Sequence, residues 1–285
     1  MNDVISIIIP TFNRADSLPD AIGSVLEQSA GNWELIIVDD GSIDDTRQVM
    51  SKFLSDERVK YYFQENAGVS AARNKGVELS RGDYLIFLDS DDKFLPGIIS
   101  RLNKVDYSSY DLICWQVSKL IDGKYSVWKP QKLEKIYKNI RATFLAGSIC
   151  YKKEVFLKAG GYDTEMSFGE NYELGIRIGN LEKLKIKIIN ESFLLYRIQT
   201  KSRTSDSIHN KLKSNKYLLS KHKEKYKKDP YSYSRLKYQM AYLNERSGNK
   251  EEALELYREA WSINLFYFKA FLKTLWLSFK FQKSE

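Results

Sequence analysis

Histidine and cysteine are scarce in this sequence of 285 residues. The only two histidines, His209 and His222, lie in a lysine-rich tract, so neither a zinc cluster nor a Ser-His-Asp triad has residues from which to form. The only two cysteines, Cys114 and Cys150, have apolar, strand-like surroundings. We therefore predict two buried thiols in a reducing compartment.

Long apolar runs are missing as well. No uninterrupted apolar stretch approaches the ~20 residues that a membrane-spanning helix requires. The segment VISIII is too short for the hydrophobic region of a signal peptide, and Pro10 ends it. We therefore expect a cytoplasmic protein and leave open a peripheral position on the inner face of the cytoplasmic membrane.

Glycine-rich phosphate-binding sequences are also absent. Because neither GxGxxG nor GxxxxGK[ST] occurs, a dinucleotide-binding dehydrogenase and a P-loop enzyme have no support. The net charge of +8 and the pI of about 9.1 favour acidic partners, namely nucleotides, nucleic acid or an anionic membrane surface. Nucleic-acid binding leaves the acidic segments described below unexplained, so we expect no nucleic-acid partner.

Strand-like and helix-like segments alternate in the first part of the chain. Residues 4–9, WELIIVDD, VKYYF and YLIFLD read as buried strands, and helical patterns lie between them. This alternation predicts an α/β fold with a mostly parallel sheet flanked by helices. The polar segments 10–14, 39–41 and 89–92 follow three of these strands, and the carboxyl ends of parallel strands form one edge. The sequence therefore predicts a ligand site at that edge.

Three aspartates are crowded at the end of the fourth strand. Asp89, Asp91 and Asp92 repel one another unless a cation neutralises them. Carboxylate oxygens suit a hard divalent ion that also binds phosphate oxygens. The alternative is an N-cap and turn before a helix that begins near Leu95, but such a cap needs only one aspartate.

The chain becomes helical after about residue 206. Further strands (YDLICWQV, KYSVWK) and helices (EVFLKAGGYD, ended by glycines, and ENYELGIRIGNL) come before that point. The later segment YQMAYLNERSGNKEEALELYREA reads as a helical hairpin, in which Gly248 ends the first helix and Asn249 forms a capping box with Glu252. It resembles one tetratricopeptide unit, which we expect to pack on the catalytic domain. We predict domains at 1–205 and 206–285.

Five motifs carry a resemblance to a known family. SIIIPTFNR, WELIIVDDGSIDDT, NAGVSAARNKG, GDYLIFLDSDD and GGYD resemble, in order over residues 4–200, the motifs of family 2 glycosyltransferases with the GT-A fold. The resemblance implies inverting transfer of a sugar, of hexosyl or N-acetylhexosaminyl type, from a nucleotide-sugar, with a UDP-sugar favoured. The acceptor would be a hydroxyl of a saccharide or a lipid-linked saccharide in bacterial cell-surface polysaccharide assembly, and the cofactor Mn²⁺ or Mg²⁺.

The resemblance also implies roles for single residues. The base of the nucleotide would lie near Pro10, Thr11 and Asp40, and Arg73 near the nucleotide or diphosphate. Asp89 would face the ribose and Asp91 would bind the metal, with Asp92 in its outer shell or capping the next helix. The full set of expected donor-binding residues is Pro10, Thr11, Asn13, Arg14, Asp40, Arg73, Asp89 and Ser90.

The sequence departs from the family pattern at two places. The segment GENYELGIR resembles GEDxELxxR, but Asn171 stands where the family has its aspartate base, and an amide cannot accept a proton. Glu170 is the candidate base, because the other nearby acid, Glu173, points elsewhere on a helix. The alternatives are a base that the motifs do not identify and an inactive scaffold or binding protein. At the second place, Gln199 replaces a metal-binding histidine of some relatives. Lys201 and Arg203 either neutralise diphosphate charge or belong to a solvated loop.

The C-terminal segment NLFYFKAFLKTLWLSFKFQK mixes large apolar residues with four lysines. Such a mixture is typical of an amphipathic helix on anionic lipid. It also fits a helix packed on the protein with its lysines directed outward. Both interpretations stay open at this point.

Overall fold

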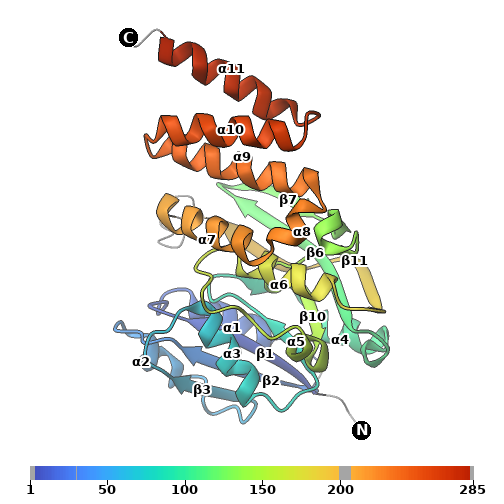
Figure 1. Cartoon of the computed structure of the whole chain (residues 1–285). Coiled ribbons are helices and arrows are strands. Elements are labelled where there is room, and N and C mark those ends of the chain that lie inside the picture. The colour runs from blue at the N-terminus through green and yellow to red at the C-terminus, as the bar shows by residue number, and fades with distance from the viewer. Residues whose placement is uncertain (1–3, 30, 199–206, 283–285) are drawn as a thin grey trace. The chain divides into compact units, whose positions relative to one another are not determined.

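The computed structural model describes residues 4–29, 31–198 and 207–282 (Figure 1). It divides into two compact units, and each is considered by itself. The first contains Met1–Lys132, Ile140–Thr164 and Glu170–Ser202, and the second contains Leu133–Asn139, Glu165–Gly169 and Arg203–Glu285. The sequence did not predict that two short inner segments group with the C-terminal helices. The expected boundary at 205/206 lies outside the described residues and stays a prediction.

A sheet of nine strands, counted over the described residues, forms the centre of the first unit. Its path is β3-β2-β1-β4-β10-β6-β11-β5, with β7 paired to β6. Strands β1 (Ile5–Thr11), β2 (Trp33–Asp39), β3 (Val59–Phe63) and β4 (Tyr84–Phe87) run parallel to one another, and β6 and β11 form a further parallel pair. The other strands are β5 (Lys93–Phe94), β6 (Leu112–Ile121), β7 (Lys124–Trp128), β10 (Ile149–Lys152) and β11 (Ile186–Ile198). The predicted α/β class and the parallel strands are confirmed.

Helices accompany this sheet in the order that the sequence pattern predicted. They are α1 (Leu18–Leu26), α2 (Thr46–Met50), α3 (Val69–Leu79), α4 (Ile98–Lys104), α5 (Lys153–Lys158) and α6 (Glu170–Gly179). Short elements complete the unit: η1 (Tyr107–Ser109), β8 (Gln131–Lys132) and β9 (Arg141–Ala142). Strands β1, β2 and β4 are buried along their whole length, as expected for parallel strands covered on both faces.

The start of α4 corrects one expectation. The helix begins at Ile98 rather than near Leu95, and its N-cap residue is Gly97. The Oε1 atom of Gln28 accepts hydrogen bonds from the N–H groups of Gly97 and Ile98, both at 3.1 Å. A distant glutamine therefore caps α4.

Both cysteines lie in the core of the first unit, as predicted. Cys114 and Cys150 are buried free thiols on the neighbouring strands β6 and β10. Burial raises the pKa of the Cys114 thiol to about 12, which keeps it protonated at neutral pH. These thiols are structural rather than reactive.

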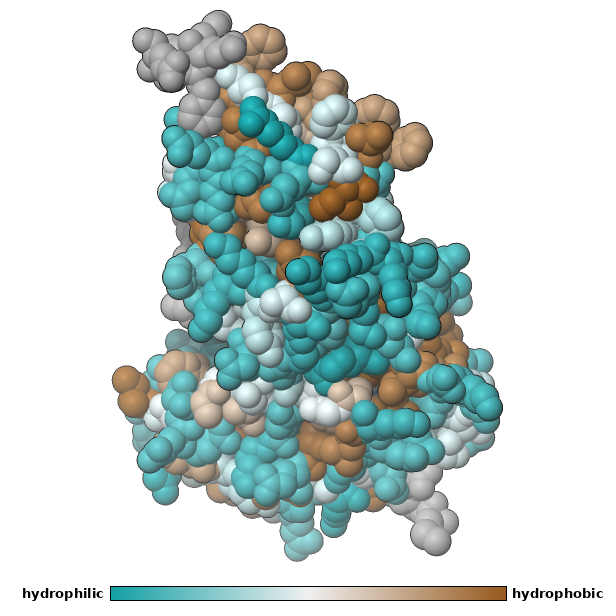
Figure 2. All heavy atoms as spheres, in the orientation of Figure 1, coloured by the Kyte–Doolittle hydropathy of each residue, from teal (hydrophilic) through white to brown (hydrophobic). Residues whose placement is uncertain are grey.

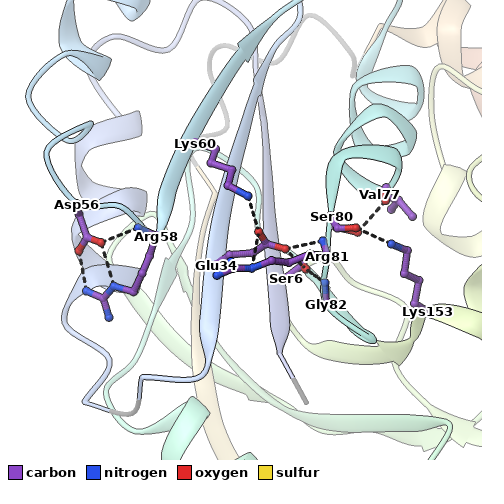
Figure 3. Close-up of polar contacts among 10 residues, drawn as sticks. All are labelled: Ser6, Glu34, Asp56, Arg58, Lys60, Val77, Ser80, Arg81, Gly82 and Lys153. Atoms are coloured by element: carbon purple, nitrogen blue, oxygen red, sulfur yellow. Dashed lines mark hydrogen bonds and ion pairs between the residues drawn. The ribbon is translucent and has the colours of Figure 1, made fainter. Parts of the chain in front are cut away.

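A buried carboxylate organises the amino-terminal edge of the parallel strands (Figure 3). Glu34 of β2 is fully buried, and its Oε1 accepts from the hydroxyl of Ser6 at 2.8 Å and from the N–H of Arg81 at 2.7 Å. Its Oε2 accepts from Lys60 Nζ at 3.0 Å. Burial alone would raise the pKa of Glu34, but these hydrogen bonds outweigh it and lower the pKa. The network ties β1, β2, β3 and the start of β4 together.

The second unit is built from helices α7 (Ile208–Lys221), α8 (Lys223–Lys227), α9 (Pro230–Arg246), α10 (Lys250–Ile263) and α11 (Phe268–Gln282), with η2 (Lys135–Tyr137) from the inner segment. Asp229 caps α9 by accepting from the N–H of Ser232, and it also accepts from the N–H of Ile136 at 2.8 Å. No helix in the described part of the chain combines the length and apolar character needed to cross a membrane.

The predicted helical hairpin is present as α9 and α10. Gly248 has a φ of +90° directly after α9, in the left-handed region where glycine is favoured. The expected capping box is wrong, because Asn249 makes no side-chain cap to α10. Its Nδ2 instead lies 3.4 Å from Asn244 Oδ1 in the preceding helix.

Candidate active site

The loops after β1 and β2 are held together by hydrogen bonds. Because β2, β1 and β4 are neighbouring parallel strands, their carboxyl ends meet at one edge, as the sequence predicted. The N–H of Asn13 donates to Ser42 Oγ at 2.8 Å, and Asn13 Oδ1 accepts from the N–H of Ile43 at 2.9 Å. The N–H of Arg14 donates to Thr46 Oγ1 at 3.1 Å. These bonds fix the two loops that would face a nucleotide.

Asp40 organises the loop that leads into α3. Its Oδ1 accepts from Gln64 Nε2 at 2.7 Å and from the N–H of Ala67 at 2.9 Å, and its Oδ2 accepts from the N–H of Gly68 at 2.8 Å. The carboxylate is 3% exposed. The resemblance implies that Asp40 also contacts the base of the nucleotide. That contact would add to the structural role of Asp40.

The neighbouring Asp39 was not singled out from the sequence. Its Oδ1 accepts from the N–H of Ser42 at 2.8 Å, and its Oδ2 accepts from the Tyr61 hydroxyl at 2.6 Å. Burial, followed by the hydrogen bond to Asp39, raises the pKa of Tyr61. Pro10 and Thr11 are buried at the end of β1, where the Thr11 carbonyl accepts from the N–H of Asp40 at 2.8 Å.

Arg73 is the central cation of the site. Its guanidinium is buried, and Nη2 lies 2.6 Å from Asp89 Oδ1 while Nη1 lies 2.8 Å from Glu170 Oε1. The guanidinium carbon is 5.0 Å from the centre of the Tyr162 ring. Burial alone would lower the pKa of Arg73, but the two carboxylates raise it. One buried cation thus joins the end of β4 to the first residue of α6.

The three crowded aspartates have different surroundings. Asp89 is ion-paired to Arg73, and Asp92 is fully buried, with its Oδ1 accepting from the N–H of Arg197 at 3.2 Å. Ser90 is also buried, whereas Asp91 is half-buried. No group of three His, Cys, Asp or Glu side chains within residues 4–29, 31–198 and 207–282 is placed to hold a metal ion. A divalent cation held by one of these aspartates would therefore need its remaining oxygen ligands from a diphosphate and water.

The residues at the start of α6 form a second cluster. Glu170 is 13% exposed, and Asn171 Nδ2 lies 3.4 Å from its Oε1. Asn171 Oδ1 accepts from the Tyr162 hydroxyl at 2.9 Å. Glu173 is fully buried and ion-paired to Arg177 at 2.6 Å, so it is not available to a substrate. The structure therefore brings Glu170 and Asn171 together with Arg73 and Asp89, and it separates Glu173 from them.

Two further positioning residues were missed by the sequence reasoning. Asn74 Nδ2 donates to the Tyr162 carbonyl at 2.8 Å, and Asn74 Oδ1 accepts from the Tyr162 N–H at 2.9 Å. The sequence offered one signal for them, because Asn74 lies in the motif NAGVSAARNKG and Tyr162 lies in the motif GGYD. The candidates Gln199, Lys201 and Arg203 lie outside the described residues.

Comparison with known proteins identifies the family. The model of the family described as "Glycosyl transferase family 2" matches residues 6–164 of this chain. A putative teichuronic acid biosynthesis glycosyltransferase, TuaG of Bacillus subtilis (strain 168), is 46% identical over 93 residues, which are 32% of this chain and 37% of TuaG. The GalNAc(5)-diNAcBac-PP-undecaprenol beta-1,3-glucosyltransferase of Campylobacter jejuni is 30% identical over 203 residues, which are 68% of this chain and 64% of that enzyme. The chain thus spans less than two thirds of these relatives.

Solved structures support the fold. The crystal structure of S. aureus TarS 1-349 superposes with a TM-score of 0.62 at 13% identity, over 99% of this chain and 92% of that chain. The same protein in complex with UDP-GlcNAc gives a TM-score of 0.63 at 15% identity, over 92% of this chain and 88% of that chain. This likeness shows the fold, which is of the GT-A type expected from the sequence. Since the family match extends over more than half of the chain, the protein belongs to glycosyltransferase family 2.

Proposed function

We propose that this protein transfers a sugar from a UDP-sugar to a hydroxyl of a saccharide or lipid-linked saccharide during cell-surface polysaccharide assembly, with inversion at the anomeric carbon. The family assignment supports the reaction class. The observation that carries the proposal is the ion-pair network in which Arg73 binds both Asp89 and Glu170. The network joins Asp89, which would contact the donor nucleotide, to Glu170, which would take the proton of the acceptor hydroxyl.

Glu170 is the proposed general base. An acceptor hydroxyl must lose a proton as it attacks the sugar, and a carboxylate within hydrogen-bond reach can take it. Arg73 orients the Glu170 carboxylate from one side, and the Asn171 amide lies on the same oxygen atom. Asn171 would therefore position the base without adding a second negative charge.

Asp91 is the proposed protein ligand for Mn²⁺ or Mg²⁺, with Asp89 directed toward the ribose. When bound, the metal would stabilise the negative charge that develops on the departing diphosphate. Support comes from the half-buried position of Asp91 beside a buried Asp92 and an ion-paired Asp89. TarS, which shares the fold, has been crystallised with UDP and with UDP-GlcNAc, and this favours a uridine nucleotide here.

A catalytically inactive scaffold is the second candidate. The observation that favours it is Asn171, since the family's aspartate base is missing at that position. The two functions differ in a simple measurement. An enzyme releases UDP from a UDP-sugar when acceptor is present, whereas a scaffold binds the nucleotide without turnover.

The proposal is tested by thermal unfolding with nucleoside diphosphates, with and without Mn²⁺. A ligand at 100 times its dissociation constant stabilises a fold by about 2.7 kcal/mol. We expect UDP to raise the melting temperature strongly only with Mn²⁺, and Asp91→Asn to remove the Mn²⁺-dependent part. Asp83→Asn, at the exposed opposite end of the same strand, is the matched control and should behave as the wild type. Equal stabilisation by UDP with chelator present would contradict the metal site.

A further inference from the structure

Helix α11 exposes a continuous row of large apolar side chains. We call Phe268, Leu272, Leu275, Trp276 and Phe279 the α11 stripe, and their exposed fractions lie between 41% and 65%. Leu265 and Phe266, just before the helix, are 61% and 87% exposed. Hydrophobic spheres accordingly gather over α11 in Figure 2. Contiguous apolar surface of this kind marks an interaction site.

The spacing shows that the α11 stripe is one face of the helix. Its members follow the pattern i, i+4, i+7, i+8 and i+11, which is typical of a helix face that packs into a core. The covered face is a different one, because the buried residues within 268–279 of α11 are Ala270 and Leu277. At about 100° per residue, these two lie on the side of the helix opposite to Phe279. The helix therefore has apolar residues on two sides, and the α11 stripe is the side that stays exposed.

The positive charge around the α11 stripe indicates what kind of surface would bind it. Residues 264–283 contain four lysines and no acidic residue. Lys269 is exposed, and it lies about 80° around the helix from Phe279, so it borders the α11 stripe. Lys273 lies on the same flank, 4.8 Å from the Trp276 ring, although it also bonds to Glu245 at 3.0 Å. This arrangement complements a negatively charged surface.

The size and composition of α11 favour a lipid surface over a second copy of the chain. At 1.5 Å per residue, its 15 residues extend about 22 Å, which is less than the roughly 30 Å of a bilayer core. Such a helix lies in the interface, where tryptophan and phenylalanine enter the boundary between headgroups and acyl chains. Two copies meeting through the stripe would bring lysines of the same sign together, which opposes self-association.

We propose that the α11 stripe docks on an anionic phospholipid bilayer, with the helix parallel to the membrane surface and Lys269 at the lipid phosphates. The proposal concerns the second unit alone and does not depend on catalysis by the first. A peripheral position would suit a lipid-linked acceptor, but membrane binding can be measured without any substrate.

The test is sedimentation of the full chain with vesicles of phosphatidylcholine alone or mixed with phosphatidylglycerol. We expect binding to the mixed vesicles, weakening with salt, and a loss of at least about tenfold in the triple variant Phe268→Ser/Leu272→Ser/Phe279→Ser. Lys269→Glu should weaken binding by about fivefold or more. The matched control is Tyr125→Ser/Val127→Ser/Leu157→Ser, which removes three apolar side chains that are also more than half exposed from the first unit and should bind as the wild type.

A second measurement uses the wild type and does not require a folded triple variant. Trp276 lies in the stripe, so brominated lipids in mixed vesicles should quench fluorescence that Trp276→Phe lacks. Absence of this quenching, or equal binding to neutral and anionic vesicles, would overturn the proposal. So would self-association of the wild type that the triple variant abolishes while neither protein sediments with vesicles, since the stripe would then be a contact between copies.

Discussion

At the scale of single residues, the site depends on how charge is balanced around Arg73. One buried guanidinium faces the carboxylates of Asp89 and Glu170. An aspartate at position 171 would add a third carboxylate next to Glu170 Oε1, where Asn171 Nδ2 now lies at 3.4 Å. Because residue 171 is an amide, Glu170 supplies the carboxylate of this segment that contacts Arg73. This is consistent with Glu170 as the single proposed base.

The first prediction concerns Glu170→Gln. The amide keeps the size of the side chain and an oxygen for Arg73 but cannot take a proton. We expect turnover to fall by about 10²–10⁴-fold, because that is the usual contribution of a general base. UDP affinity in the presence of Mn²⁺ should stay unchanged. Transfer kinetics and calorimetric titration measure the two quantities.

Controls separate the base from its surroundings. Glu154→Gln, an exposed carboxylate on α5, should turn over as the wild type. Asn171→Ala should be milder than Glu170→Gln, since its proposed role is positioning. A Glu170→Gln protein that folds and turns over normally would remove Glu170 from the mechanism.

At the scale of elements, the approach of α3 to β1 sets the position of Arg73. Gly76 lies about one turn after Arg73, and a Cβ atom there would meet Ile8 Cγ2 well inside contact distance. Glycine at this place lets the helix lie close to the central strand. Asp40 fixes the other end of the same segment through the N–H groups of Ala67 and Gly68. The helix is thus held at both ends of the stretch that presents Arg73.

The second prediction is that Gly76→Ala destabilises the protein by about 1–3 kcal/mol, because an added methyl group overpacks the contact with β1. UDP affinity should also fall, since α3 carries Arg73. Gly23→Ala in α1 is the matched control: a Cβ there meets nothing within 4 Å. That change should stabilise by about 0.4–1 kcal/mol. Urea unfolding measures both, and a Gly76→Ala protein as stable as Gly23→Ala would refute the close approach.

At the scale of the whole molecule, polar groups define two opposite edges of the parallel strands. The carboxyl edge carries the candidate site, and the amino edge is joined by Glu34, Ser6 and Lys60 (Figure 3). The pKa of Glu34 is lower in the folded protein than its ordinary value of 4.5. Its contribution to stability is therefore complete above about pH 4.5 and is lost as the pH falls through the lower folded value.

The third prediction follows from this linkage. Glu34→Gln should lower the free energy of unfolding by about 1–3 kcal/mol at pH 7, because hydrogen bonds to charged groups are lost. The difference from the wild type should shrink as the pH falls below about 4, where the carboxylate itself becomes protonated. Urea unfolding at several pH values measures it, with exposed Glu57→Gln as the control. A difference that does not change with pH would show that Glu34 acts through packing alone.

Local patterns in the sequence determined much of the fold. Continuous apolar runs identified β1, β2 and β4, and their alternation with helices placed the polar segments at one edge of a parallel sheet. Helix starts were less predictable, because a side chain far away in the sequence, Gln28, supplies the cap of α4. The same holds for Asn249, which bonds to Asn244 rather than capping α10. Donor and metal contacts stay predictions.

Tertiary structure alone decided which candidate residues meet. The sequence placed Arg73, Asp89 and Glu170 in separate motifs, and their ion pairs join residues 16 and 97 positions apart. Helical spacing already directed Glu173 away from Asn171, and the fold adds that Glu173 is buried against Arg177. Periodicity reports which side of an element faces the core, because that is a local property of the chain. An ion pair between two elements depends on how the sheet brings distant loops together. No local pattern in the sequence encodes the separation of those loops in space.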